Sequence, residues 1–187
     1  RSFGFPVVVA INRFPSDTAE ELSIVKDRAL EMGAYGAAES RGFSEGGEGC
    51  TELAQTVVRA TEGEPPTVTY QYEEDASIED KVHALAQKVY GASDVSWSPI
   101  ARRTLRTYQE LGWNTLPVCM AKTHLSLSHN PALRGRPSGY TFEVSDVRAS
   151  LGAGFIYPLA GSMVTLPGLP SSPRMLDVDD NGAILGL

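Results

Sequence analysis

Two aromatic residues stand close behind two expected strands, at positions from which they could hold a flat heterocycle. The wholly apolar run 6–11 predicts a strand buried on both faces of a parallel sheet, and Phe14 follows it. Phe43 follows an extended segment expected over 34–39. Ligands of open α/β sheets bind beyond the carboxyl ends of the strands. Both rings are therefore expected at one edge of the sheet, unless Phe14 packs under the following helix as a hydrophobic staple.

The glycine-rich segment 42–49 has two interpretations. Its free backbone N–H groups and the start of the next helix could hold an anion. Alternatively, the glycines supply the positive φ angles of a tight turn. Glu45 and Glu48 flank the loop and would repel a phosphate, which weighs against the first interpretation.

A third candidate is the segment 121–129, in which hydroxyl side chains alternate with apolar ones. If the segment is extended, His124, Ser126 and Ser128 share one face, as suits contact with a polar ligand. His129 then points away from His124, which argues against a metal site built from the two. The alternative is an edge strand with one solvated face.

Composition and missing motifs exclude several classes of protein. The 187 residues carry 16 basic and 23 acidic side chains, and a net charge of −7 argues against general binding to nucleic acid or anionic membranes. Two cysteines fit a reducing compartment, and no apolar run approaches the roughly 20 residues of a membrane span. The sequence has no Walker A motif, dinucleotide fingerprint, zinc-type Cys/His spacing or Gly-x-Ser-x-Gly elbow.

The N-terminal third reads as strand, helix, strand, helix, which predicts a βαβ unit and an α/β fold. Thr18 and Glu21 predict a capping box at the start of the first helix, and Gly33 its end. The second helix is expected to turn four apolar residues inward: Leu53, Ala54, Val57 and Val58. Because the chain opens on an apparently central strand, we expect it to be the C-terminal piece of something longer.

The rest of the chain predicts a smaller mixed α+β part that is rich in short strands. Helices are expected from Ser77 to about Gly91 and over 99–111, with strands over 70–72 and 116–120. From Tyr140 onward, short extended runs alternate with Gly and Pro. The expected domains are 1–61, a βαβα core segment; 62–120, a helix and strand linker; and 121–187, a β-rich subdomain.

The chain as a whole resembles the formate–tetrahydrofolate ligase family, in particular its C-terminal third. Each motif is weak alone, but together they are specific because they occur in family order and near family spacing. They are Pro6-Val7-Val8-Val9-Ala10-Ile11-Asn12, Phe14, Asp17-Thr18, Glu45-Gly46-Gly47-Glu48-Gly49, Asp80-Lys81, Tyr90-Gly91-Ala92, Leu116-Pro117, Ala121-Lys122-Thr123, Ser126, Ser128 and Leu166-Pro167-Gly168-Leu169-Pro170. The resemblance implies that 1–61 belongs to the C-terminal part of a P-loop-type parallel α/β sheet.

The resemblance also implies a reaction and a pterin site. ATP, with Mg, would phosphorylate formate, and tetrahydrofolate would attack the formyl phosphate. The pterin would lie between Phe14 and Phe43, with Pro15 and Ala38 lining the same slot. Phe43 stands where the family has Trp, and Gly42 where it often has His.

By the same resemblance, Lys122, Thr123, Ser126 and Ser128 are candidates for the ATP side of the cleft. Catalytic residues and any tightly bound metal or cofactor are expected outside the 187 residues. Expected partners are tetrahydrofolate, formate, ATP, the remaining part of the enzyme and a further copy of it, in the cytoplasm or the mitochondrion.

Two other classes compete with this interpretation. A non-catalytic α/β module derived from the same family would use the same surface for binding or assembly. A GTPase-like nucleotide binder is suggested by Asn12-Arg13-Phe14, but the missing P-loop counts against it.

Overall fold

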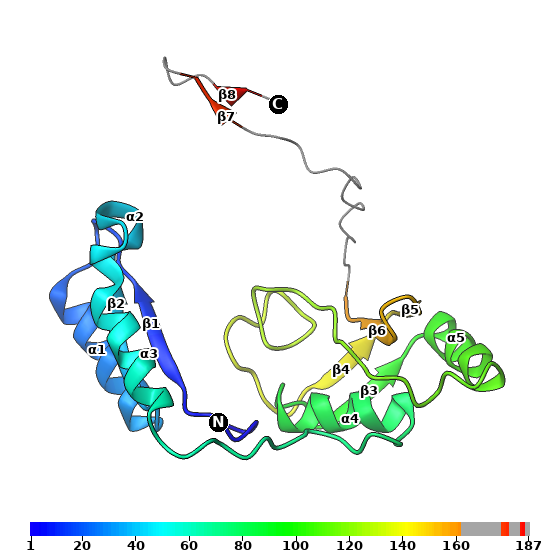
Figure 1. Cartoon of the computed structure of the whole chain (residues 1–187). Coiled ribbons are helices and arrows are strands. Elements are labelled where there is room, and N and C mark those ends of the chain that lie inside the picture. The colour runs from blue at the N-terminus through cyan, green and yellow to red at the C-terminus, as the bar shows by residue number, and fades with distance from the viewer. Residues whose placement is uncertain (162–176, 180–183, 186–187) are drawn as a thin grey trace.

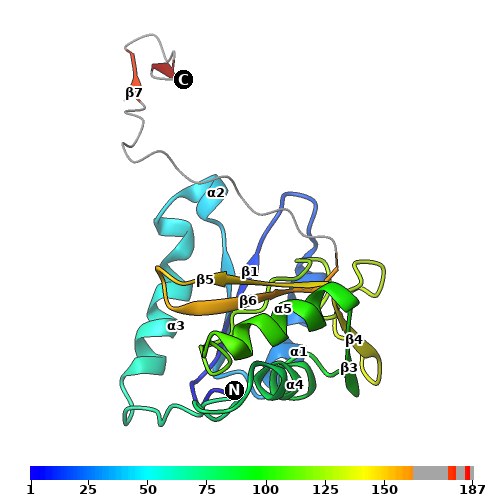
Figure 2. The ribbon, with the colours of Figure 1, turned by 90° about the vertical axis from the view of Figure 1, so that its right-hand side faces the viewer.

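The chain is an α/β protein whose described helices and short strands form two units (Figure 1). The computed structural model describes residues 1–161, 177–179 and 184–185. We call residues 8–61 the N-terminal unit and residues 78–160 the C-terminal unit. The link over 62–77 joins them and runs past the N-terminus (Figures 1 and 2).

The N-terminal unit contains a parallel strand pair joined by one helical crossover and followed by a second helix, as the sequence predicts. Its elements are β1 (Val8–Asn12), α1 (Ala19–Glu31), β2 (Gly36–Ser40), α2 (Gly42–Glu45), the 3-10 helix η1 (Glu48–Cys50) and α3 (Thr51–Thr61). β1 and β2 are parallel, with Val8 opposite Gly36 and Asn12 opposite Ser40. The predicted capping box at Thr18 and Glu21 is confirmed, and so is the turn at Gly33, whose φ is +84°.

Helices α1 and α3 pack on opposite faces of β2, because successive residues of a strand point to opposite sides. Ala37 clusters with Leu22 of α1 and Ile11 of β1. On the other face, Ser40 Oγ lies 3.6 Å from Cys50 Sγ. A Cβ added at Gly36 would lie 2.6 Å from Thr56 Cγ2, so this glycine lets α3 approach the strand closely.

The predicted inward face of α3 is wrong for three of its four residues. Ala54, Val57 and Val58 are exposed and Leu53 is half-buried, while Thr56 is the buried residue of this helix. The helix turns Thr56 toward β2 because Gly36 leaves room for it. The Thr56 hydroxyl is satisfied locally, since it donates to Glu52 O at 2.8 Å. The polar residue can therefore pack there while the apolar residues face away.

The glycine-rich segment has more regular secondary structure than a loop, since it forms α2, a turn and η1. Only part of the turn prediction is confirmed, at Gly46, where φ is +59°. Gly47 has ordinary helical φ of −61°. Gly49 serves close approach instead, because a Cβ there would lie 2.7 Å from Arg41 O.

No strand forms over 70–72, so that prediction is wrong. Gln71 is buried and takes its hydrogen bonds through its side chain, which donates to Ser2 O at 2.8 Å and Thr69 O at 3.0 Å. Lys88 Nζ in turn donates to Gln71 O at 2.8 Å. Isolated hydrogen bonds to Ser2, near the N-terminus, and to Lys88 of the next helix therefore hold the link in place of a strand ladder.

The C-terminal unit carries the main core. Its elements are α4 (Ile78–Lys88), β3 (Asp94–Trp97), α5 (Pro99–Glu110), β4 (Thr141–Val144), β5 (Asp146–Ser150) and β6 (Phe155–Leu159). β3 and β4 are parallel, whereas β5 and β6 are antiparallel. The predicted N-cap at Ser77 is confirmed, since its hydroxyl accepts a bond from Asp80 N. Ser98 caps α5 in the same way, through a bond from Ala101 N. β3 and β5 were not predicted from the sequence.

The predicted strand over 116–120 is replaced by isolated parallel bridges from Val118 to Ile156 and from Ala121 to Leu159. Pro117 and Pro158 lack backbone N–H groups, which prevents a continuous ladder here. The segment 121–129 is likewise not a strand but a series of bends with single bridges.

The core of the C-terminal unit contains residues from both sides of position 120, including Ile78 and Phe142. The domain boundaries at 61/62 and 120/121 stay predictions. Beyond this unit, β7 (Asp177–Val178) and β8 (Ile184–Leu185) form a short antiparallel pair. The motif Leu166-Pro167-Gly168-Leu169-Pro170 lies outside the described residues. In the described ranges, none of the helices has the length and apolarity to span a membrane.

Candidate functional site

The candidate site lies at the carboxyl edge of β1 and β2, where the two following loops are tied together. Arg13 N donates to Ser40 O at 3.0 Å, which extends the strand pairing by one bond. The Arg13 guanidinium also pairs with Glu39 Oε2 at 2.9 Å. The chain segments leading to the two predicted aromatic residues therefore leave the sheet side by side.

Phe14 lies in a tight turn directly after β1. Its backbone N–H donates to Asp17 Oδ2 at 2.8 Å, and its carbonyl accepts from Asp17 N at 3.0 Å. The ring remains 63% exposed. This exposure does not fit the staple interpretation, in which the ring would be covered by α1. Pro15, in the same turn, is also exposed.

Phe43 lies in α2 directly after β2, and its side chain is fully exposed. Ser44 N and Glu45 N both donate to Arg41 O and so hold the one-turn helix, together with the Arg41–Glu45 ion pair at 3.3 Å. Two large apolar rings thus stand open to solvent at one edge. The carboxyl ends of parallel strands are where ligands of open α/β sheets bind.

Ala38 is placed differently from the other predicted pterin contacts. It lies in the middle of β2, opposite Ala10, and is only 1% exposed. The structure therefore brings Phe14, Pro15 and Phe43 to the accessible edge and leaves Ala38 beneath it.

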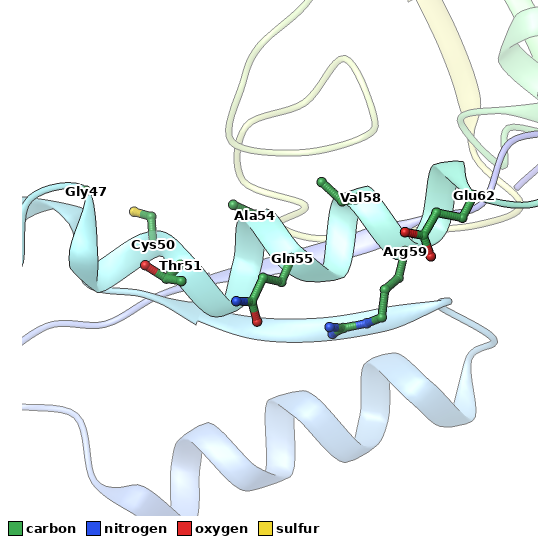
Figure 3. Close-up of a pocket in the computed structure, with 8 residues that line it drawn as sticks. All are labelled: Gly47, Cys50, Thr51, Ala54, Gln55, Val58, Arg59 and Glu62. Atoms are coloured by element: carbon green, nitrogen blue, oxygen red, sulfur yellow. The ribbon is translucent and has the colours of Figure 1, made fainter.

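A shallow groove of about 460 Å³ begins at the glycine-rich turn and follows α3 (Figure 3). None of the four predicted pterin contacts lines it. In Figure 3, Gln55 and Arg59 extend from one side of the helix and Ala54 and Val58 from the other. The residues that line the groove are Gly47, Cys50, Thr51, Ala54, Gln55, Val58, Arg59 and Glu62.

The predicted ATP-side residues lie together in the C-terminal unit, in the loop before β4. Lys122 Nζ donates to Thr123 O at 3.0 Å and to Ser126 O, and lies 5.4 Å from the centre of the Tyr90 ring. Burial lowers the pKa of Lys122. The ammonium is thus held by the carbonyls of its own loop.

The hydroxyls of this loop are also used internally. The Ser126 and Ser128 Oγ atoms lie 2.8 Å apart, and both side chains are buried. Ser128 Oγ accepts from Asn130 N, while Thr123 Oγ1 accepts from Leu125 N. In this conformation, the four residues shape the loop. Their contact with a nucleotide stays a prediction.

Lys81 was not among the predicted functional residues, although a signal was present. Lys81 falls on the inward stripe of α4 between Ile78 and Val82, where an apolar residue is expected. Its side chain is fully buried. In the part of the chain that the structure describes, no cluster of three or more His, Cys, Asp or Glu side chains could hold a metal ion.

The fold and the exposed aromatic edge define an α/β protein with a candidate ligand site at strand ends, and comparison with known proteins gives its family. The family model for formate–tetrahydrofolate ligase matches residues 1–187. The chain belongs to the formate–tetrahydrofolate ligase family.

Similar proteins come from bacteria and eukaryotes. The formate–tetrahydrofolate ligase of Roseiflexus castenholzii is 50% identical over 100% of this chain and 33% of its own length. The mitochondrial C-1-tetrahydrofolate synthase of Saccharomyces cerevisiae is 47% identical over 100% of this chain and 19% of its own length. The cytoplasmic synthase of Mus musculus is 48% identical over 96% of this chain and 19% of its own. The chain thus spans about a third of the bacterial relative.

Proposed function

We propose that this chain is part of an enzyme that joins formate to tetrahydrofolate in an ATP-dependent reaction, and that it supplies the pterin-stacking surface. The observation that carries the proposal is the pair Phe14 and Phe43, exposed behind two adjacent parallel strands. A pterin is flat and has polar edges, so offset stacking on aromatic rings suits it. The ligases to which the chain is similar bear tetrahydrofolate in their names.

The remaining parts of the reaction are assigned more coarsely. ATP, with its Mg, and formate are substrates in this proposal, and the phosphate-binding catalytic part lies outside the 187 residues. Lys122, Thr123, Ser126 and Ser128 form the proposed ATP-side segment. Among them, Lys122 is the side chain that would have to leave its loop carbonyls to reach a phosphate.

We also propose that β1 and β2 belong to a larger, P-loop-type parallel sheet. Support comes from the apolar run of β1, whose one pairing partner among the described strands is β2. The names of the mouse and yeast relatives suggest the cytoplasm, with the mitochondrion as the other candidate. Association with the rest of the enzyme, or with a second copy, completes the proposed assembly.

Calorimetric titration with tetrahydrofolate tests the pterin proposal. Saturable binding is expected for the chain and a clear loss of affinity for Phe14→Ala and Phe43→Ala. Tyr70→Ala is the matched control, because it removes another exposed ring, 82% accessible, from the link. Phe43→Trp is expected to tighten binding, since the larger ring offers more stacking area.

Failure of the folded chain to bind would contradict a preformed pterin site. Binding that Tyr70→Ala weakens as much as Phe14→Ala would place the ligand elsewhere. A folded chain that binds no tetrahydrofolate but associates with other parts of the enzyme would favour the non-catalytic assembly module.

A further inference from the structure

Lys81 is a buried lysine for which the proposed reaction has no use. Its relative exposure is 0%, and it lies on the core side of α4 next to Ile78 and Val82. Lysine is almost never fully buried without partners, because removing an ammonium from water costs several kcal/mol. The contacts of its Nζ atom therefore need an explanation.

Backbone carbonyls surround the ammonium. Lys81 Nζ donates to Glu74 O at 2.6 Å, to Thr115 O at 2.6 Å and to Leu116 O at 3.4 Å. The ammonium has three N–H donors, so each has one acceptor. The Tyr72 ring adds a face to the same site, with its centre 5.4 Å from Nζ.

This set of contacts resembles a cation site more than an ion pair. No carboxylate lies within salt-bridge distance of Lys81 among the described residues. Rings of carbonyl oxygens hold small monovalent cations elsewhere in proteins, with aromatic faces as a further source of attraction. Burial lowers the pKa of Lys81, and the nearby Glu74 and Asp75 act in the opposite direction.

The site joins segments that are distant in sequence. Glu74 belongs to the link, and Thr115 and Leu116 belong to the segment that leads to the proposed ATP-side loop. Tyr72 reinforces the same junction, because its hydroxyl accepts a bond from Val118 N at 3.2 Å. Val118 in turn bridges to Ile156 of β6.

We propose that the Lys81 side chain is a tethered monovalent cation: it fills a carbonyl cage that, once the side chain is truncated, binds a small primary ammonium ion. In this role Lys81 is a positioning residue. It fixes the link and the segment 115–118 to α4. The proposal stands on these contacts alone and does not depend on tetrahydrofolate binding.

A competing explanation is that Lys81 merely fills space. Buried charges can often be replaced by apolar residues of similar volume without loss of stability. Lys81→Met would then unfold at the same denaturant concentration as the parent chain or a higher one. Under the cation-cage proposal it leaves the carbonyls of Glu74, Thr115 and Leu116 without their Nζ donor and lowers the folding equilibrium constant by roughly 10- to 100-fold.

Chemical rescue of Lys81→Ala gives the decisive test. Alanine is the best helix former, so the substitution leaves α4 itself intact. It creates a cavity with the volume of the deleted part of the side chain. Denaturant unfolding of the 187-residue chain is followed through Trp97 and Trp113, which lie in the C-terminal unit. We expect n-propylammonium, which matches the deleted atoms, to restore the unfolding midpoint in a saturable manner.

Two controls separate the cage from general effects of salt or apolar solutes. n-Propanol has similar shape without the charge, and tetramethylammonium has the charge without N–H donors, so neither is expected to rescue. Lys88→Ala removes a more exposed lysine of the same helix, bonded to the single carbonyl of Gln71, and is expected to show no saturable rescue.

Each outcome decides the proposal. Equal effects of n-propylammonium and n-propanol on Lys81→Ala, or no effect of either, would overturn it, as would an undiminished midpoint for Lys81→Met. If Lys81→Ala is unfolded in dilute buffer, its refolding yield with each additive provides the same comparison.

Discussion

The two units of the molecule differ in how much apolar surface they bury. Among the described residues, the core cluster of the C-terminal unit has twelve buried members, including Ile78, Phe142 and Ile156. The cluster of the N-terminal unit has three, Ile11, Leu22 and Ala37. The N-terminal unit nevertheless exposes nine large hydrophobic side chains, against five in its larger neighbour.

This difference separates residues that hold the fold from residues available to a ligand. In the C-terminal unit, aromatic rings pack on one another, as in the Tyr90–Phe142 stack with centroids 5.6 Å apart. In the N-terminal unit, Phe14 and Phe43 are open to solvent and contribute little to the core. Aromatic substitutions in the two units are therefore expected to have opposite consequences for stability and binding.

The largest expected effect is that of Phe142→Ala. The ring is fully buried and contacts Tyr90, Tyr140 and His129, so its removal leaves a cavity. We expect a loss of about 3–5 kcal/mol in the free energy of unfolding. Urea unfolding followed by tryptophan fluorescence measures it. A loss below 1 kcal/mol would show that the larger cluster is not the main source of stability.

Leu22→Ala is expected to cost less, about 2 kcal/mol, because its cluster is small and the site can collapse. Val25→Ala, at a 46% exposed position of the same helix, is the matched control. Both tryptophans, Trp97 and Trp113, lie in the C-terminal unit. If the units unfold separately, Leu22→Ala shifts the circular dichroism transition and leaves the fluorescence transition unchanged. Coincident shifts in both signals would show that the units unfold together.

Alkaline pH is expected to weaken the C-terminal unit through its tyrosines. Burial raises the pKa of Tyr90, Tyr108 and Tyr140 above the ordinary value of 10.0, with smaller contributions from Cys119, Asp146 and Tyr90 respectively. The unfolded chain then releases these protons first, so stability is fully present below pH 10 and falls above it. Fluorescence-detected unfolding across pH 9 to 11 measures the slope, and Tyr108→Phe is expected to reduce it. An unchanged slope in that variant would contradict the assignment.

Thr18→Ala is expected to cost about 1 kcal/mol, the usual value of an N-cap. Hydrogen bonds from the Thr18 backbone and side chain lower the pKa of Glu21 below 4.5. Their stabilising contribution is present above pH 4.5 and is lost as the pH falls through the lowered pKa. Circular dichroism of the chain and of Thr18→Ala at pH 7 and pH 3 should show a smaller difference in acid. An equal difference at both pH values would exclude a role for the Glu21 charge.

The smallest effect on stability is expected for Phe43→Ala, within about 0.5 kcal/mol, because the ring is fully exposed. The same substitution is expected to weaken tetrahydrofolate binding. Comparing its unfolding midpoint with that of Phe142→Ala contrasts a solvent-exposed ring with a core ring. A large loss of stability in Phe43→Ala would show that the ring packs in solution.

Local sequence signals predicted the helices of both units well. The caps at Thr18 and Ser77 and the turn at Gly33 depend on residues within a few positions, so they can be read directly. The parallel pairing of β1 and β2 also followed from the order of elements. The position of Phe14 and Phe43 behind those strands came from the same pattern.

Side-chain environments could not be predicted in this way. The inward face of α3 was wrong because Gly36, on another element, gives Thr56 room to pack. The strand over 116–120 was wrong because its partner β6 carries Pro158, which interrupts the ladder. Ser126 and Ser128 were expected on one face of an extended segment, yet bends in the chain turn both inward. Their contact with a nucleotide stays a prediction.

The sequence by itself determined the family of this protein, the helix ends and the strand order of its N-terminal unit, because these depend on residue types at short spacing. Only the tertiary structure decided which helix and strand faces are buried and which carbonyl groups Lys81 contacts. Those outcomes depend on groups that approach from distant positions, such as the Thr115 carbonyl, 34 residues along the chain from Lys81. A local pattern shows that a lysine lies on an apolar stripe, but it does not show which carbonyl groups the lysine contacts.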